Sequence, residues 1–153
     1  MVDTAGLSLA AVWRKGSSPF SRTIKRIFDM PEIVLIRGVP GSGKTTKAKT
    51  EYPDHALVEA DQFFMRGGQY CYDRSKIKEA HEWCQNTVKW WLRRGRDVVI
   101  ANTFTRVWEM KPYLDMGYPV RVVEATGNFD NVHGVPPEIV KRMLERFETY
   151  YED

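Results

Sequence analysis

The chain has 153 residues, 42% of them hydrophobic, which is enough apolar material for one buried core and too little for two. Its 23 lysines and arginines against 20 aspartates and glutamates give a formal charge of +3, too small an excess to indicate a nucleic-acid binder by itself. Two cysteines argue against a disulfide framework, and the absence of a membrane-length apolar run or a signal peptide leads us to expect a cytoplasmic protein with no membrane partner.

Residues 1–30 differ from the rest of the chain in composition. Basic residues stand among serines in "RKGSSPFSRTIKRIFDMP", where Pro19 and Pro31 act as breakers and periodicity is weak. This pattern predicts an N-terminal extension, mobile or draped on the surface, followed by one domain over residues 31–153. The extension is either a solvated tail that aids solubility or a basic segment that contacts phosphates.

From residue 32 onward, short apolar runs alternate with longer segments of helical periodicity. Four runs are rich in β-branched residues and bounded by turn residues: "EIVLIRG", "HALVEAD", "RDVVIAN" and "YPVRVVEAT". Their spacing leaves room for a helix after each, which predicts an α/β fold with buried parallel strands and ligands at their carboxyl ends.

The first strand leads into the glycine-rich stretch "GVPGSGKTT" at residues 38–46. It fits the phosphate-binding pattern G-x-x-x-x-G-K-S/T in the strand-to-helix context that this pattern requires. Glycines let backbone N–H groups point at phosphates, Lys44 adds a positive charge, and the Thr45 hydroxyl can bind Mg²⁺. We therefore predict a site for ATP or GTP with Mg²⁺ formed by Gly38, Pro40, Gly41, Ser42, Gly43, Lys44, Thr45 and Thr46.

A carboxylate and an arginine follow the second strand. Asp61 stands just past the apolar run, where it can accept a proton from a hydroxyl that attacks the γ-phosphate, or simply cap a helix. Arg66, five residues on, is either a clamp on an anionic acceptor or a surface residue.

Two further segments have helical periodicity. In "SKIKEAHEWCQNTVKWWLRRG" the residues at three- and four-residue steps predict a core-facing helix: Ile77, Ala80, Cys84, Val88 and Trp91. Its tryptophans are interpreted as packing residues. In "PPEIVKRMLERFETYY", Arg142 and Arg146 share one face beside an apolar stripe of Ile139, Met143 and Phe147, and surface ion pairs are the alternative to a catalytic role. His133 either caps this helix or touches the nucleotide.

Several segments occur in an order that characterises a known family: "RGVPGSGKTT", "ADQFF", "AHEWCQ", "NTFTRVWEMKPY" and "HGVPPEIVKRMLERFE". Over residues 33–149 the chain resembles the NEDD4-binding-protein-2-like P-loop kinases, which are similar in turn to the kinase domain of phage polynucleotide 5′-hydroxyl kinases. The resemblance implies an adenylate-kinase-like, three-layer α/β/α fold with a parallel sheet of about four to five strands. It implies Asp61 as the general base, and Asn102 and Thr103 as the polar pair near the acceptor. The predicted metal-contacting residues are Thr45 and Asp61, and the predicted acceptor-binding residues are Arg66, Asn102 and Thr103.

The chain departs from the family pattern in two places. The family usually has Asp-Asn-Thr-Asn where this chain has Ala101, Asn102, Thr103 and Phe104. Between Glu124 and His133 most of a lid helix with paired arginines is missing, and Asp130 stands where an arginine is expected. Because such arginines neutralise charge on the transferred group, we expect a shortened lid in which Arg106, Arg142 or Arg146 takes over this role. Lys44, Asp61, Arg66, Arg142 and Arg146 are the predicted catalytic residues.

Three functions fit these features. The expected one is a kinase that transfers the γ-phosphoryl group of ATP or GTP to a hydroxyl, with the 5′ end of DNA or RNA as acceptor. The second is a nucleotide-binding interaction protein with weak or no catalysis, because its lid is short. The third is a small-molecule kinase. The basic extension favours a polyanionic acceptor over a small one.

Overall fold

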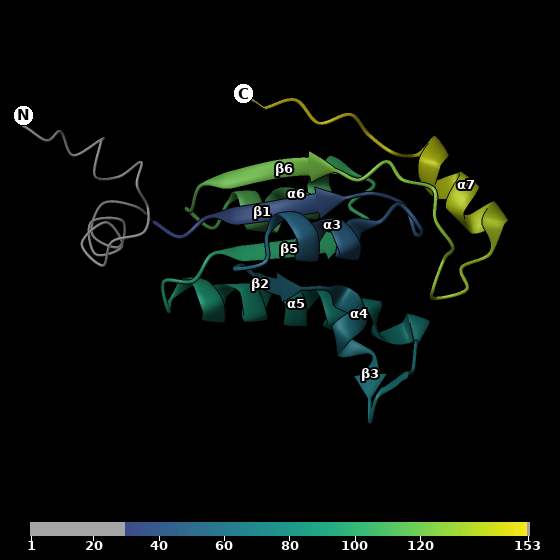
Figure 1. Cartoon of the computed structure of the whole chain (residues 1–153), viewed down its shortest axis with the longest axis horizontal. Helices are drawn as coiled ribbons and strands as arrows, with labels where there is room; N and C mark the ends of the chain where they lie inside the picture. Colours follow the sequence, from purple (N-terminus) through teal and green to yellow (C-terminus); the bar gives the residue numbers. More distant parts are fainter. Residues whose placement is uncertain (1–29, 153) are drawn as a thin grey trace, which may run out of the picture. The chain divides into compact units, whose positions relative to one another are not determined.

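The computed structural model describes residues 30–152 (Figure 1). Residues 1–29 and 153 lie outside the described part, and with them all of the expected basic extension except Met30. The division of the chain into residues 1–30 and 31–153 therefore stays a prediction.

The centre of the fold is a parallel sheet of four strands in the order β2-β5-β1-β6. The strands are β1 (Ile33–Arg37), β2 (Ala56–Val58), β5 (Val98–Asn102) and β6 (Val120–Glu124). Every residue of β1 and β5 is buried, as expected for central parallel strands that are covered on both faces. All four predicted strands are confirmed, and their carboxyl ends meet at one edge of the sheet.

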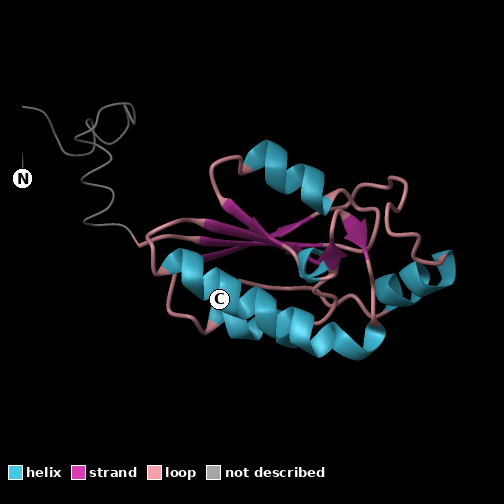
Figure 2. Cartoon of the chain, turned by 90° about the horizontal axis from the view of Figure 1, so that it is seen from below, coloured by secondary structure: helices cyan, strands magenta, loops and turns pink. Residues whose placement is uncertain are grey.

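Helices cover both faces of the sheet, as Figure 2 shows. On one face, α5 (Ile77–Leu92) and α6 (Val107–Leu114) pack against the odd-numbered residues of β1. On the other, α3 (Lys44–Glu51) packs its buried Ala48 against the even-numbered residues. Two further helices, α4 (Ala60–Phe63) and α7 (Pro137–Glu145), lie beyond the sheet edge (Figure 1). The expected three-layer α/β/α fold is thus confirmed. Between residues 30 and 152, no helix is long and apolar enough to cross a membrane.

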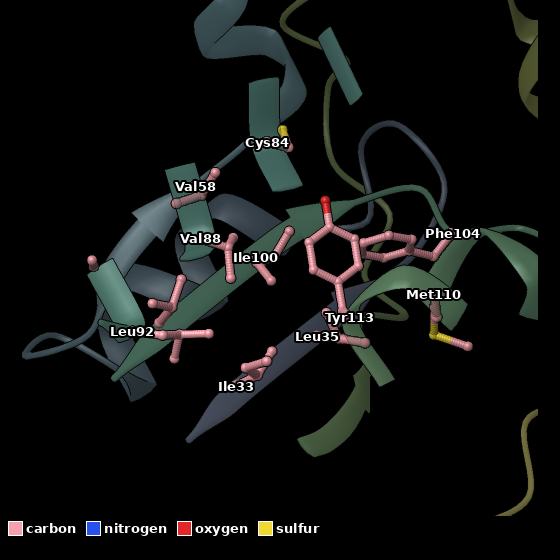
Figure 3. Close-up of a cluster of buried hydrophobic side chains, with 12 residues drawn as sticks. Ile33, Leu35, Val58, Cys84, Val88, Leu92, Ile100, Phe104, Met110 and Tyr113 are labelled. Atoms are coloured by element: carbon pink, nitrogen blue, oxygen red, sulfur yellow. The ribbon is translucent and has the colours of Figure 1, made fainter. Parts of the chain in front are cut away.

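The larger core cluster joins β1, β2, β5, α5 and α6 (Figure 3). Its α5 residues are Cys84, Val88 and Leu92, each at most 2% exposed, and Ala80 of the same helix is also buried. The predicted stripe was wrong at Ile77, which is 36% exposed, and it did not include Leu92, which is 2% exposed. Trp91 and Trp83 pack at the margin of this core, whereas Trp90 is exposed and stacks on Arg94.

A small hairpin follows α4 that the sequence analysis did not predict. Strands β3 (Met65–Arg66) and β4 (Gln69–Tyr70) pair antiparallel around the two-residue turn Gly67-Gly68. Both glycines have positive φ, 56° and 80°, which is the conformation that a tight hairpin turn requires and that glycine adopts at little cost. A 3₁₀ turn (Arg74–Lys76) then leads into α5.

The last helix is shorter than predicted. We expected a helix through residues 136–151, but α7 ends at Glu145 and Arg146 is its C-cap. Phe147 turns away from the helix, and its ring lies 4.1 Å from the Arg37 guanidinium. The Glu148 backbone N–H donates to the Thr105 carbonyl oxygen. These tertiary contacts take the place of the further helical turns that the sequence pattern predicted.

Candidate functional site

The glycine-rich segment forms a tight loop between β1 and α3. Gly41 and Gly43 have φ angles of +83° and +87°, a region that other L-residues rarely adopt. Gly38 has a different constraint, because a Cβ atom there would lie 2.7 Å from the Ala125 carbonyl oxygen. The glycines therefore fix the course of this loop, which opens toward the amino end of α3.

Lys44 is the first residue of α3 and reaches back over the loop. Its Nζ donates to the Val39 carbonyl oxygen at 3.0 Å. Burial lowers the pKa of Lys44, and the nearby carboxylates of Asp61 and Glu59 act in the opposite direction. The ammonium group thus lies inside the loop, where an anion of the ligand would replace the Val39 carbonyl.

Glu59 is a site residue that the sequence analysis missed. It directly follows β2, and its carboxylate accepts a hydrogen bond from the Thr45 hydroxyl. Burial raises the pKa of Glu59 despite this bond. Glu59 is also the N-cap of α4, so that the alternative interpretation of Asp61 as a helix cap was wrong. The sequence signal that could have identified Glu59 as a site residue was its place at the carboxyl end of a predicted strand.

Asp61 lies two positions after Glu59, in the first turn of α4, and has two partners. The Tyr70 hydroxyl donates to Asp61 Oδ1 at 2.8 Å, and His133 Nε2 lies 3.1 Å from Oδ2. The Asp61 side chain is 46% exposed, so that it stays open to a substrate. Burial and the Asp61 charge raise the pKa of the Tyr70 phenol, which keeps it a donor at neutral pH. The contact between His133 and Asp61 was not suggested by the sequence analysis, which expected His133 to cap a helix or touch the nucleotide.

Asn102 and Thr103 follow β5 at the same edge of the sheet. Asn102 is 7% exposed, and its Oδ1 accepts from the Ala60 backbone N–H at 2.9 Å. The Thr103 carbonyl oxygen accepts from the Gly38 N–H at 3.1 Å. Both residues therefore tie β5 to neighbouring loops as well as lining the site.

A cleft of about 1260 Å³ connects these residues. Most of the sequence-predicted site residues line it: Pro40, Gly41, Gly43, Lys44, Thr45, Thr46, Asp61, Asn102, Thr103, Arg142 and Arg146. Gly38 and Ser42 are buried beneath the loop. Arg66, on β3, is exposed and not among the lining residues. Arg106 is also outside the lining, and it pairs with Glu148 at 3.0 Å.

The two remaining arginines enter the cleft from the C-terminal segment. Arg142 on α7 and Arg146 just after it line the wall together with Ile139 and Met143. In the described part of the chain neither arginine forms an ion pair, so that the expected alternative of surface pairs with Glu138 or Glu145 was wrong. Both guanidinium groups are available to an anionic ligand.

The segment that replaces the lid helix is a loop without helical structure over residues 125–136, which confirms the expected shortened lid. Two backbone hydrogen bonds attach it to the glycine-rich loop, from Gly127 N–H to the Ser42 oxygen at 3.0 Å and from Phe129 N–H to the Gly41 oxygen at 2.8 Å. Asp130 lines the cleft, in the place where an arginine was expected. A smaller hollow of about 350 Å³ lies behind Phe129, between this loop and α3.

Comparisons with known proteins agree with this geometry. A family model named AAA_33 and described as an AAA domain matches residues 33–126. Human NEDD4-binding protein 2 is 36% identical over 135 residues, which cover 77% of this chain and 8% of that protein, so the chain spans a small part of its relative's length.

Two solved structures share the fold. A chain of the Pnkp1/Rnl/Hen1 RNA repair complex superposes with a TM-score of 0.61 at 17% identity, covering 78% of this chain and 44% of that one. A gluconokinase from Sinorhizobium meliloti 1021 gives a TM-score of 0.50 at 17% identity, covering 79% and 77%. At such identities these likenesses establish the P-loop kinase fold and leave the substrate open.

Proposed function

The chain belongs to the AAA_33 family and is a relative of NEDD4-binding protein 2 with the fold of P-loop kinases. From this premise we propose that it transfers the γ-phosphoryl group of ATP or GTP to the 5′-hydroxyl of a polynucleotide. The family and the fold support a phosphotransferase in general. The polynucleotide acceptor and a cytoplasmic location go beyond that support and belong to the proposal. The observation that carries it is that Asp61 and the glycine-rich loop line one cleft.

In this proposal the loop holds the triphosphate. Backbone N–H groups and Lys44 would bind the phosphate oxygens, and Thr45, Glu59 and Asp61 are the residues that would hold Mg²⁺. These hydroxyl and carboxylate oxygens are the ligands that Mg²⁺ prefers, and the ion would neutralise charge on the β- and γ-phosphates. Within residues 30–152 no cluster of three or more His, Cys, Asp or Glu side chains forms a metal site, so the ion would take its other ligands from the nucleotide and from water.

Asp61 is the proposed general base. An incoming hydroxyl would take the place of His133 or Tyr70 at a carboxylate oxygen and donate its proton to Asp61 as its oxygen bonds to the γ-phosphorus. The bond between the γ-phosphorus and the β–γ bridging oxygen would break, and the nucleoside diphosphate would leave with that oxygen. Arg142 and Arg146 would stabilise charge on the transferred group, because both line the cleft and neither forms an ion pair within the described residues.

One observation favours a second function, a nucleotide-binding protein with little catalysis. The loop over residues 125–136 holds no arginine and is attached by its backbone to the glycine-rich loop. If Arg142 and Arg146 do not reach the γ-phosphate, nucleotide binding would persist while transfer would be slow.

The test is single-turnover transfer of labelled γ-phosphate to oligonucleotides with a free 5′-hydroxyl, with 5′-phosphorylated oligonucleotides as the control acceptor. Asp61→Asn keeps the shape and removes the charge, so we expect a rate about 10²–10⁴-fold lower at nearly unchanged nucleotide affinity. Asp54→Asn, an exposed residue outside the cleft, is the matched control.

An unchanged rate in Asp61→Asn would remove Asp61 from the mechanism. Labelling of a nucleoside or a sugar, with neither DNA nor RNA labelled, would establish the small-molecule kinase instead. Tight nucleotide binding without transfer to any acceptor would favour the binding protein.

A further inference from the structure

An aromatic cluster whose ring faces have no role in the proposed phosphate chemistry lines the cleft. The Tyr70 and Tyr72 rings are nearly parallel, at 19°, with centroids 6.3 Å apart. Phe64, which is 4% exposed, supports both from below, with centroids 6.3 Å from Tyr70 and 5.2 Å from Tyr72. The pair of Tyr70 and Tyr72, here called the tyrosine platform, is therefore held in position by a core residue.

The platform is open to solvent at Tyr72, whereas the Tyr70 ring packs against the His133 ring, with centroids 4.4 Å apart. Tyr72 is 54% exposed, although a tyrosine can bury a large apolar area when it has a partner. Its position follows from the hairpin, since β4 ends at Tyr70 and the chain continues directly to Tyr72. Both tyrosines line the cleft that holds Asp61.

The tyrosine platform lies next to the proposed general base, because the Tyr70 hydroxyl donates a hydrogen bond to Asp61 Oδ1 at 2.8 Å. A molecule whose hydroxyl group reaches Asp61 would therefore lie against the platform. Arg74, His81, Arg142 and Arg146 line the same cleft. Aromatic faces beside cationic side chains are the combination that binds single-stranded nucleic acid, since rings stack on bases and cations contact phosphates.

We propose that the tyrosine platform is a stacking subsite for the nucleobases at the 5′ end of a single-stranded acceptor. This inference rests on the proposed function and specifies how that acceptor is held. Stacking uses the π-face that every base has, so the subsite would accept DNA and RNA ends of any sequence and require an unpaired base.

The experiment measures binding to the full chain by fluorescence anisotropy, without nucleotide, using an eight-nucleotide DNA with a free 5′-hydroxyl and a 3′ fluorophore. Tyr72→Ala should weaken binding about 5- to 100-fold, the range that loss of base stacking produces. Tyr72→Phe keeps the ring and should bind as the wild type does. Trp108→Ala is the matched control, because Trp108 is 70% exposed and outside the cleft lining.

A second arm does not depend on a variant that folds. An oligonucleotide whose two 5′-terminal residues are abasic should bind the wild type as weakly as the normal oligonucleotide binds Tyr72→Ala, and the two losses should not add. Equal binding of normal and abasic oligonucleotides, or an unaffected Tyr72→Ala, would overturn the subsite.

The result separates this inference from the proposed function. Tyr72-dependent binding without phosphoryl transfer leaves the subsite standing and removes the kinase. Transfer to 5′-hydroxyl ends that is indifferent to Tyr72 and to the terminal bases leaves the kinase standing and removes the subsite.

Discussion

Arg37 holds the carbonyl oxygen of Phe104 with two nitrogen atoms of its guanidinium, Nε at 3.1 Å and Nη2 at 2.8 Å. Arg37 is fully buried at the end of β1, immediately before the glycine-rich loop. Nη2 also donates to the Thr105 oxygen at 3.3 Å, and Nη1 lies 3.5 Å from the half-exposed Glu124 carboxylate. One side chain thus ties the nucleotide loop to the segment that follows β5.

We predict that Arg37→Met lowers the free energy of unfolding by roughly 2–4 kcal/mol, because two buried carbonyl oxygens lose charged donors. Urea denaturation measures the change. Arg37→Lys should recover little of it, since a single ammonium cannot reproduce the planar fork. Wild-type stability in either variant would show that the Arg37 contacts contribute no net stability.

Lys44→Ala should weaken binding of ATP-Mg²⁺ by more than about 100-fold while the fold remains intact, because the loop loses its positive charge. Titration calorimetry measures the affinity, and circular dichroism checks the fold. Lys78→Ala removes an exposed lysine of α5 and should bind the nucleotide normally. Equal affinity in Lys44→Ala and the wild type would contradict the assignment of this loop.

Glu59→Gln should stabilise the nucleotide-free protein at pH 8 and much less at pH 5. Burial raises the pKa of Glu59, so the wild type is favoured below the unfolded-state pKa and loses stability as the pH rises through the folded-state pKa. The neutral amide has no such loss. Melting temperatures of both proteins at the two pH values test the sign.

The same substitution should weaken the effect of Mg²⁺ on nucleotide affinity, because the Glu59 carboxylate is hydrogen-bonded to the Thr45 hydroxyl.

For the stability prediction, a Glu59→Gln protein that is less stable than the wild type at pH 8 would show that the hydrogen bond from Thr45 outweighs the cost of burying the charge.

Arg142→Ala and Arg146→Ala should each lower the single-turnover transfer rate, by about 10²–10³-fold for an arginine that contacts the transferred group. Nucleotide affinity should change by a few-fold only. Arg106→Ala breaks an ion pair with Glu148 outside the cleft and serves as the control. If all three variants behave alike, neither cleft arginine replaces the missing lid arginines.

The sheet and the glycine-rich loop were predictable because their signals are local. Four β-branched runs bounded by turn residues became the four strands, and the spacing of glycines and Lys44 marks the loop. The end of α7 was not predictable in the same way, because Phe147 leaves the helix to stack on Arg37, which is 110 positions earlier (147 − 37). No local pattern contains that contact.

The rest of the site depends on the hairpin. Tyr70 reaches Asp61 only because the chain reverses at Gly67-Gly68, and Glu59 meets Thr45 only because β2 ends beside α3. Phe104, an anomaly in the sequence, is explained by packing. It is 2% exposed, and its ring lies 5.8 Å from Tyr113. Its φ of +45° is the kind of backbone strain that packing has to offset.

The two backbone bonds between the 125–136 loop and the glycine-rich loop have a thermodynamic consequence. Phe129 N–H and Gly127 N–H can exchange with solvent only when those bonds open, and the acceptors of both bonds belong to the residues that would surround a phosphate. Any ligand that favours one arrangement of the glycine-rich loop must therefore change the opening equilibrium of the second loop by the same coupling free energy, and the reverse holds equally. Hydrogen exchange at the Phe129 backbone N–H therefore reports whether the site is occupied, even when the Phe129 side chain does not contact the ligand.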